Sequence, residues 1–167
     1  IDYADSGKVI TNQTISWPVA LSGGFQGSLT ARQNVRFVAR LYVNSHEEVE
    51  HVVNFVEEFA EIGKYFDMPM KSYSSGMRSR IGFGLSMAFN FDYYLLDEAG
   101  AVGDASFRKK SQALLDELKE NSNIIMVSHD LKDLTRNCDV AFLVRDGKAE
   151  YFDNVQDAVE VYKAYAS

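Results

Sequence analysis

The chain has 167 residues, of which 46% are hydrophobic and 25% are charged, a balance typical of a folded domain with its own core. Its net charge of -7 argues against a general nucleic-acid binder or a polybasic membrane-surface protein, because both need an excess of Lys and Arg. The single cysteine, Cys138, excludes an internal disulfide, and no apolar run is long enough to span a bilayer. We therefore expect no nucleic-acid partner and no direct membrane insertion.

The first part of the chain predicts short strands, a glycine-rich loop and then helices. Pro18 is typical of a sheet edge or a strand end, and Thr30 is a residue type that caps helices. Apolar residues at helical spacing follow, until Pro69 interrupts the pattern. The predicted strands are 8–10 and 15–19, the loop is 21–28, and the helices are 31–42, 47–65 and 77–89.

The second part alternates apolar strands with amphipathic helices. Asp146-Gly147 predicts the turn of a hairpin, and Asn154 predicts the cap of a last helix that buries Val155, Ala158, Val159 and Tyr162. The predicted strands are 93–96, 124–127, 140–144 and 149–152, and a helix is expected over 107–118. This order indicates an α/β fold whose largely parallel sheet is covered on both faces.

Two adjacent carboxylates, Asp97 and Glu98, follow the apolar strand 93–96. Ligands bind at the carboxyl ends of parallel strands, and neighbouring side chains there point in different directions. One acid could hold a hydrated Mg²⁺ while the other faces an attacking water, which is the Walker B arrangement of nucleotide hydrolases. For this pair alone, a strand end with solvated acids is an equal alternative.

Ser74, Ser75 and Gly76 stand directly before the predicted helix 77–89. Free N–H groups and the helix dipole make such an end an anion site, and a glycine lets a phosphate approach the backbone. His129 closes the strand 124–127 and could bond a phosphate or orient a water. Taken singly, a serine N-cap and a capping or surface histidine are the simpler explanations.

In this order and spacing, the motifs together resemble the ATP-binding cassette (ABC) ATPases. The loop 73–77 is similar to the family's signature loop, normally Leu-Ser-Gly-Gly-Gln, and Arg80 falls on the arginine of the following helix. Asp104 ends a segment that looks like the D-loop, and His129 looks like the switch histidine. Four sequence segments resemble more narrowly the capsular-polysaccharide exporter ATPases of the polysialic acid type. These segments are 15–30, 65–71, 73–80 and 101–104.

The resemblance implies a P-loop NTPase-like α/β fold, with a mainly parallel sheet flanked by helices and an inserted helical subdomain. A single partial ABC ATPase domain would span 1–167. Its helical and signature subdomain would lie at about 30–90, and its core α/β portion at 1–29 and 91–167. No Gly-x-x-x-x-Gly-Lys-Ser/Thr motif occurs in the chain. We therefore expect a chain cut from a larger domain, without its N-terminal strands.

The resemblance also implies two such domains that enclose two ATP molecules, with Mg²⁺. The signature-loop residues of one subunit would touch the γ-phosphate held by the other subunit; they are Ser74, Ser75, Gly76 and Met77. The other implied site residues are Glu98 and His129 for catalysis, Asp97 for Mg²⁺ through water, Asp104 in the D-loop and Gln26 in the Q-loop.

The function implied is that of the ATP-hydrolysing subunit of an ABC transporter that powers capsule polysaccharide export. It would work as a homodimer on membrane permease subunits, at the cytoplasmic face of the bacterial inner membrane. The alternatives are a truncated or pseudo-ATPase that only dimerises or docks on a permease, an O-antigen-type exporter ATPase, and an ABC ATPase acting on DNA. The acidic charge counts against the last of these.

Four residues depart from the family's pattern. Ala99 and Gly100 stand where Pro and Thr are common, and Ser75 and Met77 replace Gly and Gln. Without a P-loop to hold the phosphates, the 167-residue chain by itself is expected to bind ATP weakly, to be inactive and to be poorly stable. Calorimetric titration of the chain with ATP tests this expectation, and micromolar affinity would contradict it.

Overall fold

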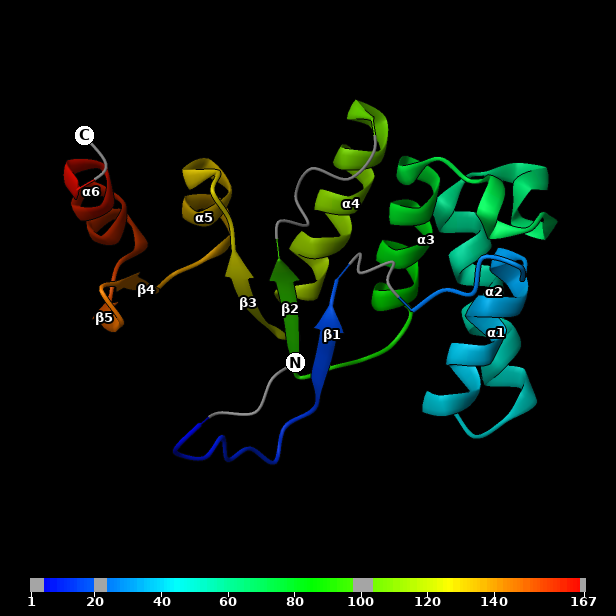
Figure 1. Ribbon diagram of the computed structural model, residues 1–167, viewed down its shortest axis with the longest axis horizontal. Coiled ribbons are helices and arrows are strands. Elements are labelled where there is room, and N and C mark those ends of the chain that lie inside the picture. Colours follow the sequence, from blue (N-terminus) through cyan, green and yellow to red (C-terminus); the bar gives the residue numbers. More distant parts are fainter. Residues whose placement is uncertain (1–4, 20–23, 98–103, 166–167) are drawn as a thin grey trace.

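The computed structural model describes residues 5–19, 24–97 and 104–165. It contains a parallel three-stranded sheet, in the order β1-β2-β3, and a separate antiparallel hairpin of β4 and β5 (Figure 1). The strands are β1 (Ile15–Pro18), β2 (Tyr93–Asp97), β3 (Asn123–Val127), β4 (Ala141–Arg145) and β5 (Lys148–Phe152). The α/β class and the hairpin are confirmed, whereas the predicted strand at 8–10 is wrong, since those residues form no strand.

Helices connect and cover these strands. They are α1 (Ala31–Tyr42), α2 (His46–Ala60), α3 (Ser75–Met87), α4 (Ala105–Leu118), α5 (Leu131–Asn137) and α6 (Val155–Tyr165), with the short 3-10 helices η1 (Gly63–Asp67) and η2 (Met70–Ser72). None of the helices in the described ranges is both long and apolar enough to cross a membrane.

Local capping explains where the first two helices begin. Thr30 and Gln33 form a capping box at α1, and Ser45 and Glu48 form another at α2. In each box the N-cap hydroxyl accepts the backbone N–H of residue N3, and the N3 side chain accepts the backbone N–H of the N-cap residue. The helix predicted over 47–65 ends earlier, at Ala60, because the next residue, Glu61, adopts a left-handed φ of 51°.

The two faces of the sheet differ in burial. Tyr94 and Leu96 point into the main core, where they pack in one cluster with Phe107 and other helix residues. On the opposite face Ile125 is 49% exposed and Val127 is 63% exposed. Within the described residues, coverage of both faces is therefore not observed. Tyr162, predicted to be buried, is 42% exposed, while its neighbours Val155, Ala158 and Val159 are buried.

A close helix–helix contact explains a glycine inside α3. A Cβ added at Gly84 would lie 3.2 Å from Cδ1 of Phe59 and 3.6 Å from Cγ1 of Val56, both on α2. Phe59 also stacks on Phe83, with ring centroids 5.6 Å apart. Glycine at this position lets α2 and α3 approach until their aromatic residues interlock, and this fixes α3 relative to the rest of the helical layer.

The only tryptophan in the sequence, Trp17, lies in an aromatic cluster between the sheet and the helices. Its ring centroid is 5.1 Å from that of Tyr42 at the end of α1, 5.7 Å from that of Phe89 and 5.5 Å from that of Phe91. Phe89 and Phe91 belong to the connection from α3 to β2. The cluster therefore joins β1, α1 and this connection through tilted and edge-on aromatic contacts.

Candidate active site

The sheet brings two of the predicted site segments to one edge. In the parallel pairing of β2 with β3, Asp97 lies opposite Val127, and His129 follows two residues later. Both Asp97 and His129 are exposed, so their polar groups can reach a ligand in solvent. The expectation that these two strands end side by side is confirmed. Glu98, the other acid of the pair, lies outside the described residues.

The edge fits a metal that is held mainly by water and substrate. Among residues 5–19, 24–97 and 104–165, no group of three or more His, Cys, Asp or Glu converges on a metal-sized site. Mg²⁺ keeps several of its waters and commonly takes only one or two carboxylates together with substrate phosphates. The exposed carboxylate of Asp97 is compatible with that mode of binding.

His129 does not cap the helix that follows it. The N-cap of α5 is Asp130, whose side chain accepts a hydrogen bond from the N–H of Lys132 at 2.8 Å. Asp130 also donates its own N–H to the hydroxyl of Ser128 at 3.0 Å. The helix-capping explanation for His129 is therefore replaced by Asp130, and His129 stands in the turn between the strand end and that cap.

Ser74 begins α3 and shapes the signature-like loop. Its hydroxyl accepts a hydrogen bond from the N–H of Met77 at 3.2 Å, the geometry of an N-cap. The N–H groups of Ser75 and Gly76 come before any helical acceptor, as at every helix start. A Cβ at Gly76 would meet only Ser74 Oγ, at 3.9 Å. The serine N-cap and the anion site are therefore compatible, because the cap uses the N–H of Met77 and not those of Ser75 and Gly76.

Arg80 connects this helix to the start of α4. Its guanidinium donates to Oδ2 of Asp104 at 2.7 Å and to the carbonyl oxygen of Ala60 at 3.2 Å, and it lies 4.6 Å from the centre of the Phe107 ring. Asp104 is the N-cap of α4 and accepts the N–H of Phe107 at 2.9 Å. That hydrogen bond, with a smaller contribution from Arg80, lowers the pKa of Asp104, which remains an anion.

We expect Arg80→Met to lower the free energy of unfolding by about 1–3 kcal/mol, because the partly buried carbonyl of Ala60 loses its side-chain donor. Asp104→Asn keeps the N-cap but removes the charge, so it should cost less. Denaturant titration of both single variants and the double variant measures the coupling. Strictly additive losses would show that the two side chains do not interact.

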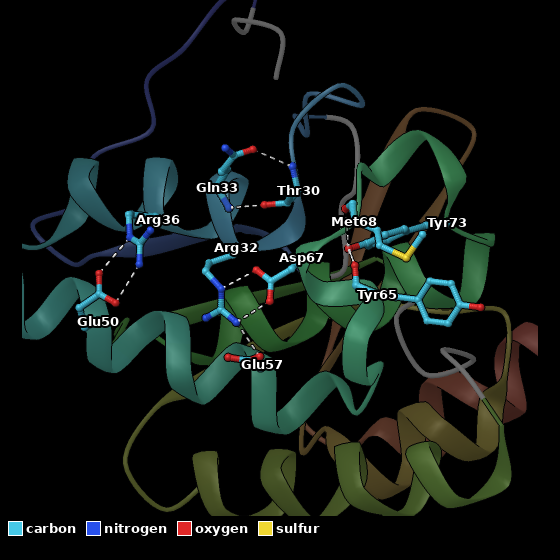
Figure 2. A network of polar contacts seen from close by, with 10 residues as sticks. All are labelled: Thr30, Arg32, Gln33, Arg36, Glu50, Glu57, Tyr65, Asp67, Met68 and Tyr73. Atoms are coloured by element: carbon cyan, nitrogen blue, oxygen red, sulfur yellow. Dashed lines mark hydrogen bonds and ion pairs between the residues drawn. The ribbon is translucent and has the colours of Figure 1, made fainter.

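The loop 73–77 is attached to η1 through its first residue, Tyr73. The hydroxyl of Tyr73 donates to the carbonyl of Tyr65 and lies 3.3 Å from the carbonyl oxygen of Met68 (Figure 2). Burial raises the pKa of this phenol. The contact ties the last residue before the Ser74 cap to η1, so the position of the loop depends on the helical layer rather than on the sheet.

The predicted site residues thus form two groups. Asp97 and the strand leading to His129 share a sheet edge, while the Ser74–Met77 loop begins α3 and is linked to Asp104 through Arg80. The N-terminal ends of α3 and α4 and the carboxyl ends of the strands face the same side of the molecule (Figure 1). Gln26 lies on another loop, with its side chain exposed.

Comparison with known proteins gives close relatives. The polysialic acid transport ATP-binding protein KpsT of Escherichia coli is 60% identical over 166 residues, which are 99% of this chain and 74% of that protein. The capsule polysaccharide export ATP-binding protein CtrD of Neisseria meningitidis serogroup B is 42% identical over 164 residues, which are 98% of this chain and 74% of that protein.

Solved structures support the fold. The ATP-binding cassette MJ0796, solved as a dimer in a post-hydrolysis state with ADP and Pi, matches with a TM-score of 0.65 at 22% identity. The match covers 82% of this chain and 61% of that one. A scan against family models finds no match. Because identity to KpsT is 60% over almost the whole chain, the chain belongs to the ABC transporter ATP-binding proteins, in the family of the polysialic acid and capsule polysaccharide exporters.

Proposed function

We propose that these residues belong to the ATP-hydrolysing subunit of an ABC transporter that powers export of a capsule polysaccharide. The observation that carries the proposal is the pairing of β2 with β3, which delivers Asp97 and the turn of His129 to one exposed edge in a chain 60% identical to a polysialic acid transport protein. The sequence identity to that protein indicates the class of cargo, and the sheet edge carries the residue types that ATP hydrolysis needs.

In this proposal each residue has a separate task. Asp97 would hold Mg²⁺ through water, and the bound metal would supply positive charge opposite the phosphates of ATP. Glu98 accepts the proton of the attacking water or orients that water by hydrogen bonding. His129 bonds the γ-phosphate and keeps the water in line. The protein's contribution is mainly positioning and charge, since phosphoryl transfer asks little covalent chemistry of its enzyme.

The signature loop requires a second subunit. Ser74, Ser75, Gly76 and Met77 offer the N-terminus of α3 to a γ-phosphate held by a partner copy, and Asp104 signals across the same interface. The cassette MJ0796 was solved as a dimer, which supports this arrangement. Residues of about 30–90 form the helical and signature subdomain, and 1–29 with 91–167 form the core α/β portion.

The proposed transport function also implies where the ATPase acts in the cell. The ATPase pair sits against membrane permease subunits at the cytoplasmic face of the bacterial inner membrane, where ATP is available. Gln26, which lies in the connection between β1 and α1, is the Q-loop glutamine that relates the state of the nucleotide to the permease.

His129→Ala tests this function. In the complete subunit we expect ATP turnover to fall by about 100-fold, with capsule at the cell surface reduced accordingly, because the imidazole no longer orients the water. Turnover of the purified protein and surface polysaccharide are measured together. His51→Ala removes an exposed histidine of α2 and is the matched control. A variant with normal turnover and normal export, or one whose only defect is a lower melting temperature, would exclude the role given to His129.

A further inference from the structure

Asn34 is buried on the inner face of α1 and is 4% exposed. It follows Ala31 by one helical turn and precedes Val35, both of which are fully buried. A polar side chain in such a place must satisfy its hydrogen bonds internally, since an unpaired one costs about 1–3 kcal/mol. The partners that Asn34 has found therefore show what the residue holds in place.

The side-chain amide of Asn34 contacts both the backbone N–H and the backbone carbonyl of Gln26. Its Oδ1 accepts the N–H of Gln26 at 2.8 Å, and its Nδ2 lies 3.1 Å from the carbonyl oxygen of the same residue. Nδ2 also donates to the carbonyl of Thr30 at 2.9 Å and lies 3.2 Å from the sulfur of Met70. One side chain thus contacts the Gln26 loop, the N-cap of α1 and the buried methionine of η2.

The loop held by Asn34 pairs with the segment that leads into the signature loop. Met70 donates its N–H to the carbonyl of Leu29 at 2.9 Å, and Lys71 donates to the carbonyl of Gly27 at 2.8 Å. Thr30 and Pro69 form an antiparallel bridge. Three residues after Met70, the chain reaches Tyr73, whose N–H bonds the Met70 carbonyl at 3.1 Å. A short series of hydrogen bonds therefore joins Gln26 to the residue before Ser74.

The two segments are also fixed to the helices around them. Arg32 of α1 donates to both carboxylate oxygens of Asp67, at 2.7 and 3.0 Å, and to Glu57 of α2 at 2.7 Å (Figure 2). The hydrogen bonds from Arg32 lower the pKa of Asp67. Arg32 thus links α1 to both η1 and α2, so the loop 26–30 and the turn 69–72 are attached to the same group of helices.

We propose that Asn34 is a positioning residue that makes the Gln26 loop and the signature loop move together. The inference rests on the proposed function, since it gives these two loops their tasks. A shift of the Gln26 backbone is carried by the Asn34 amide and the 27–29 to 70–71 pairing to Tyr73 and hence to the N-terminus of α3. Asn34 touches no substrate, and its effect is to couple export to hydrolysis.

Three variants of the complete subunit, assembled with its membrane partner, test the proposal. Asn34→Leu keeps the branching at Cγ without any polar atom, and Asn34→Asp keeps the acceptor for Gln26 while losing the donors. Asn54→Leu changes an exposed asparagine of α2 and is the control. The measurements are ATP turnover, polymer exported per ATP hydrolysed, and hydrogen exchange of the amides of Met70 and Lys71.

We expect Asn34→Leu to speed exchange at Met70 and Lys71 and to lower polymer exported per ATP by about tenfold, within the usual range of a coupling free energy. In Asn34→Asp the defect should shrink as pH falls, because a protonated carboxyl can donate to a carbonyl again and burial among carbonyls favours that form. A purely structural residue would instead lower turnover and export in parallel.

Each result decides the matter. Unchanged export per ATP in Asn34→Leu, or unchanged exchange, overturns the inference. If that variant does not fold, a pH profile of Asn34→Asp parallel to that of the wild type overturns it. Absence of ATP turnover and export in the wild-type subunit contradicts the proposed function instead, and the exchange measurement still reports on Asn34.

Discussion

Glu98→Gln in the complete subunit is expected to abolish most ATP turnover, by about 10²- to 10⁴-fold, while ATP still binds. The amide has the shape of the carboxylate but cannot accept the proton of the attacking water. The neighbouring Asp97, at the end of β2, is unchanged and can still serve the metal and phosphates. If hydrolysis separates the two subunits of the proposed dimer, the variant should accumulate as an ATP-bound closed dimer.

Three measurements check these effects. Enzyme assays give ATP turnover, calorimetry gives ATP binding, and the molecular mass in the presence of ATP shows whether a dimer accumulates. Glu120→Gln, which changes an exposed acid after α4, is the matched control and should behave as wild type. Wild-type turnover in Glu98→Gln would remove this residue from catalysis. Loss of ATP binding together with turnover would instead give it a part in holding the nucleotide.

Gly76→Asp is expected to change stability and activity in opposite directions. An acid in the first turn of α3 interacts favourably with the helix dipole, by about 0.3–1 kcal/mol, and aspartate is a better helix residue than glycine. Space is available, since an added Cβ would meet only Ser74 Oγ at 3.9 Å. The same charge repels a γ-phosphate, so turnover should fall by about 100-fold or more, the usual cost of losing one such electrostatic contact.

Denaturant unfolding and ATP turnover of the same preparation provide the comparison. Gln156→Asp places an acid at the same helical position of α6, where residue 156 is exposed, and should leave turnover unchanged. Gly76→Ala separates size from charge and should have the milder defect. If Gly76→Asp keeps full turnover, the start of α3 does not approach a phosphate, and the serine cap is its whole role.

Much of this architecture can be predicted from the sequence, because helix caps and strand ends depend on residues that are close together in the chain. Thr30 caps α1 where the sequence indicates, and the strands that carry Asp97 and His129 end together as a parallel sheet requires. The end of α2 could not be predicted in the same way, because its left-handed residue is Glu61, not a glycine. The short helix α5 has only seven residues and so has little periodicity to detect.

The contacts between distant parts of the chain are the portion that pattern reasoning misses. Arg80 and Asp104 are paired because α3 and α4 pack side by side, and no spacing rule relates two residues so far apart in sequence. Asn34 did leave a signal, as the polar member of the buried stripe that Ala31, Val35 and Ala39 form on α1. A lone asparagine on such a stripe indicates that a backbone segment must lie opposite it.

The aromatic cluster around Trp17 has a practical consequence. Since these 167 residues contain one tryptophan, their tryptophan emission, excited apart from that of the tyrosines, arises from a single known place, the junction of β1 with α1 and the approach to β2. Rotation of the helical layer relative to the sheet would move Tyr42 against the indole and alter its emission. Trp17 is thus an intrinsic reporter on this junction, and its emission would register such a rotation without any attached label.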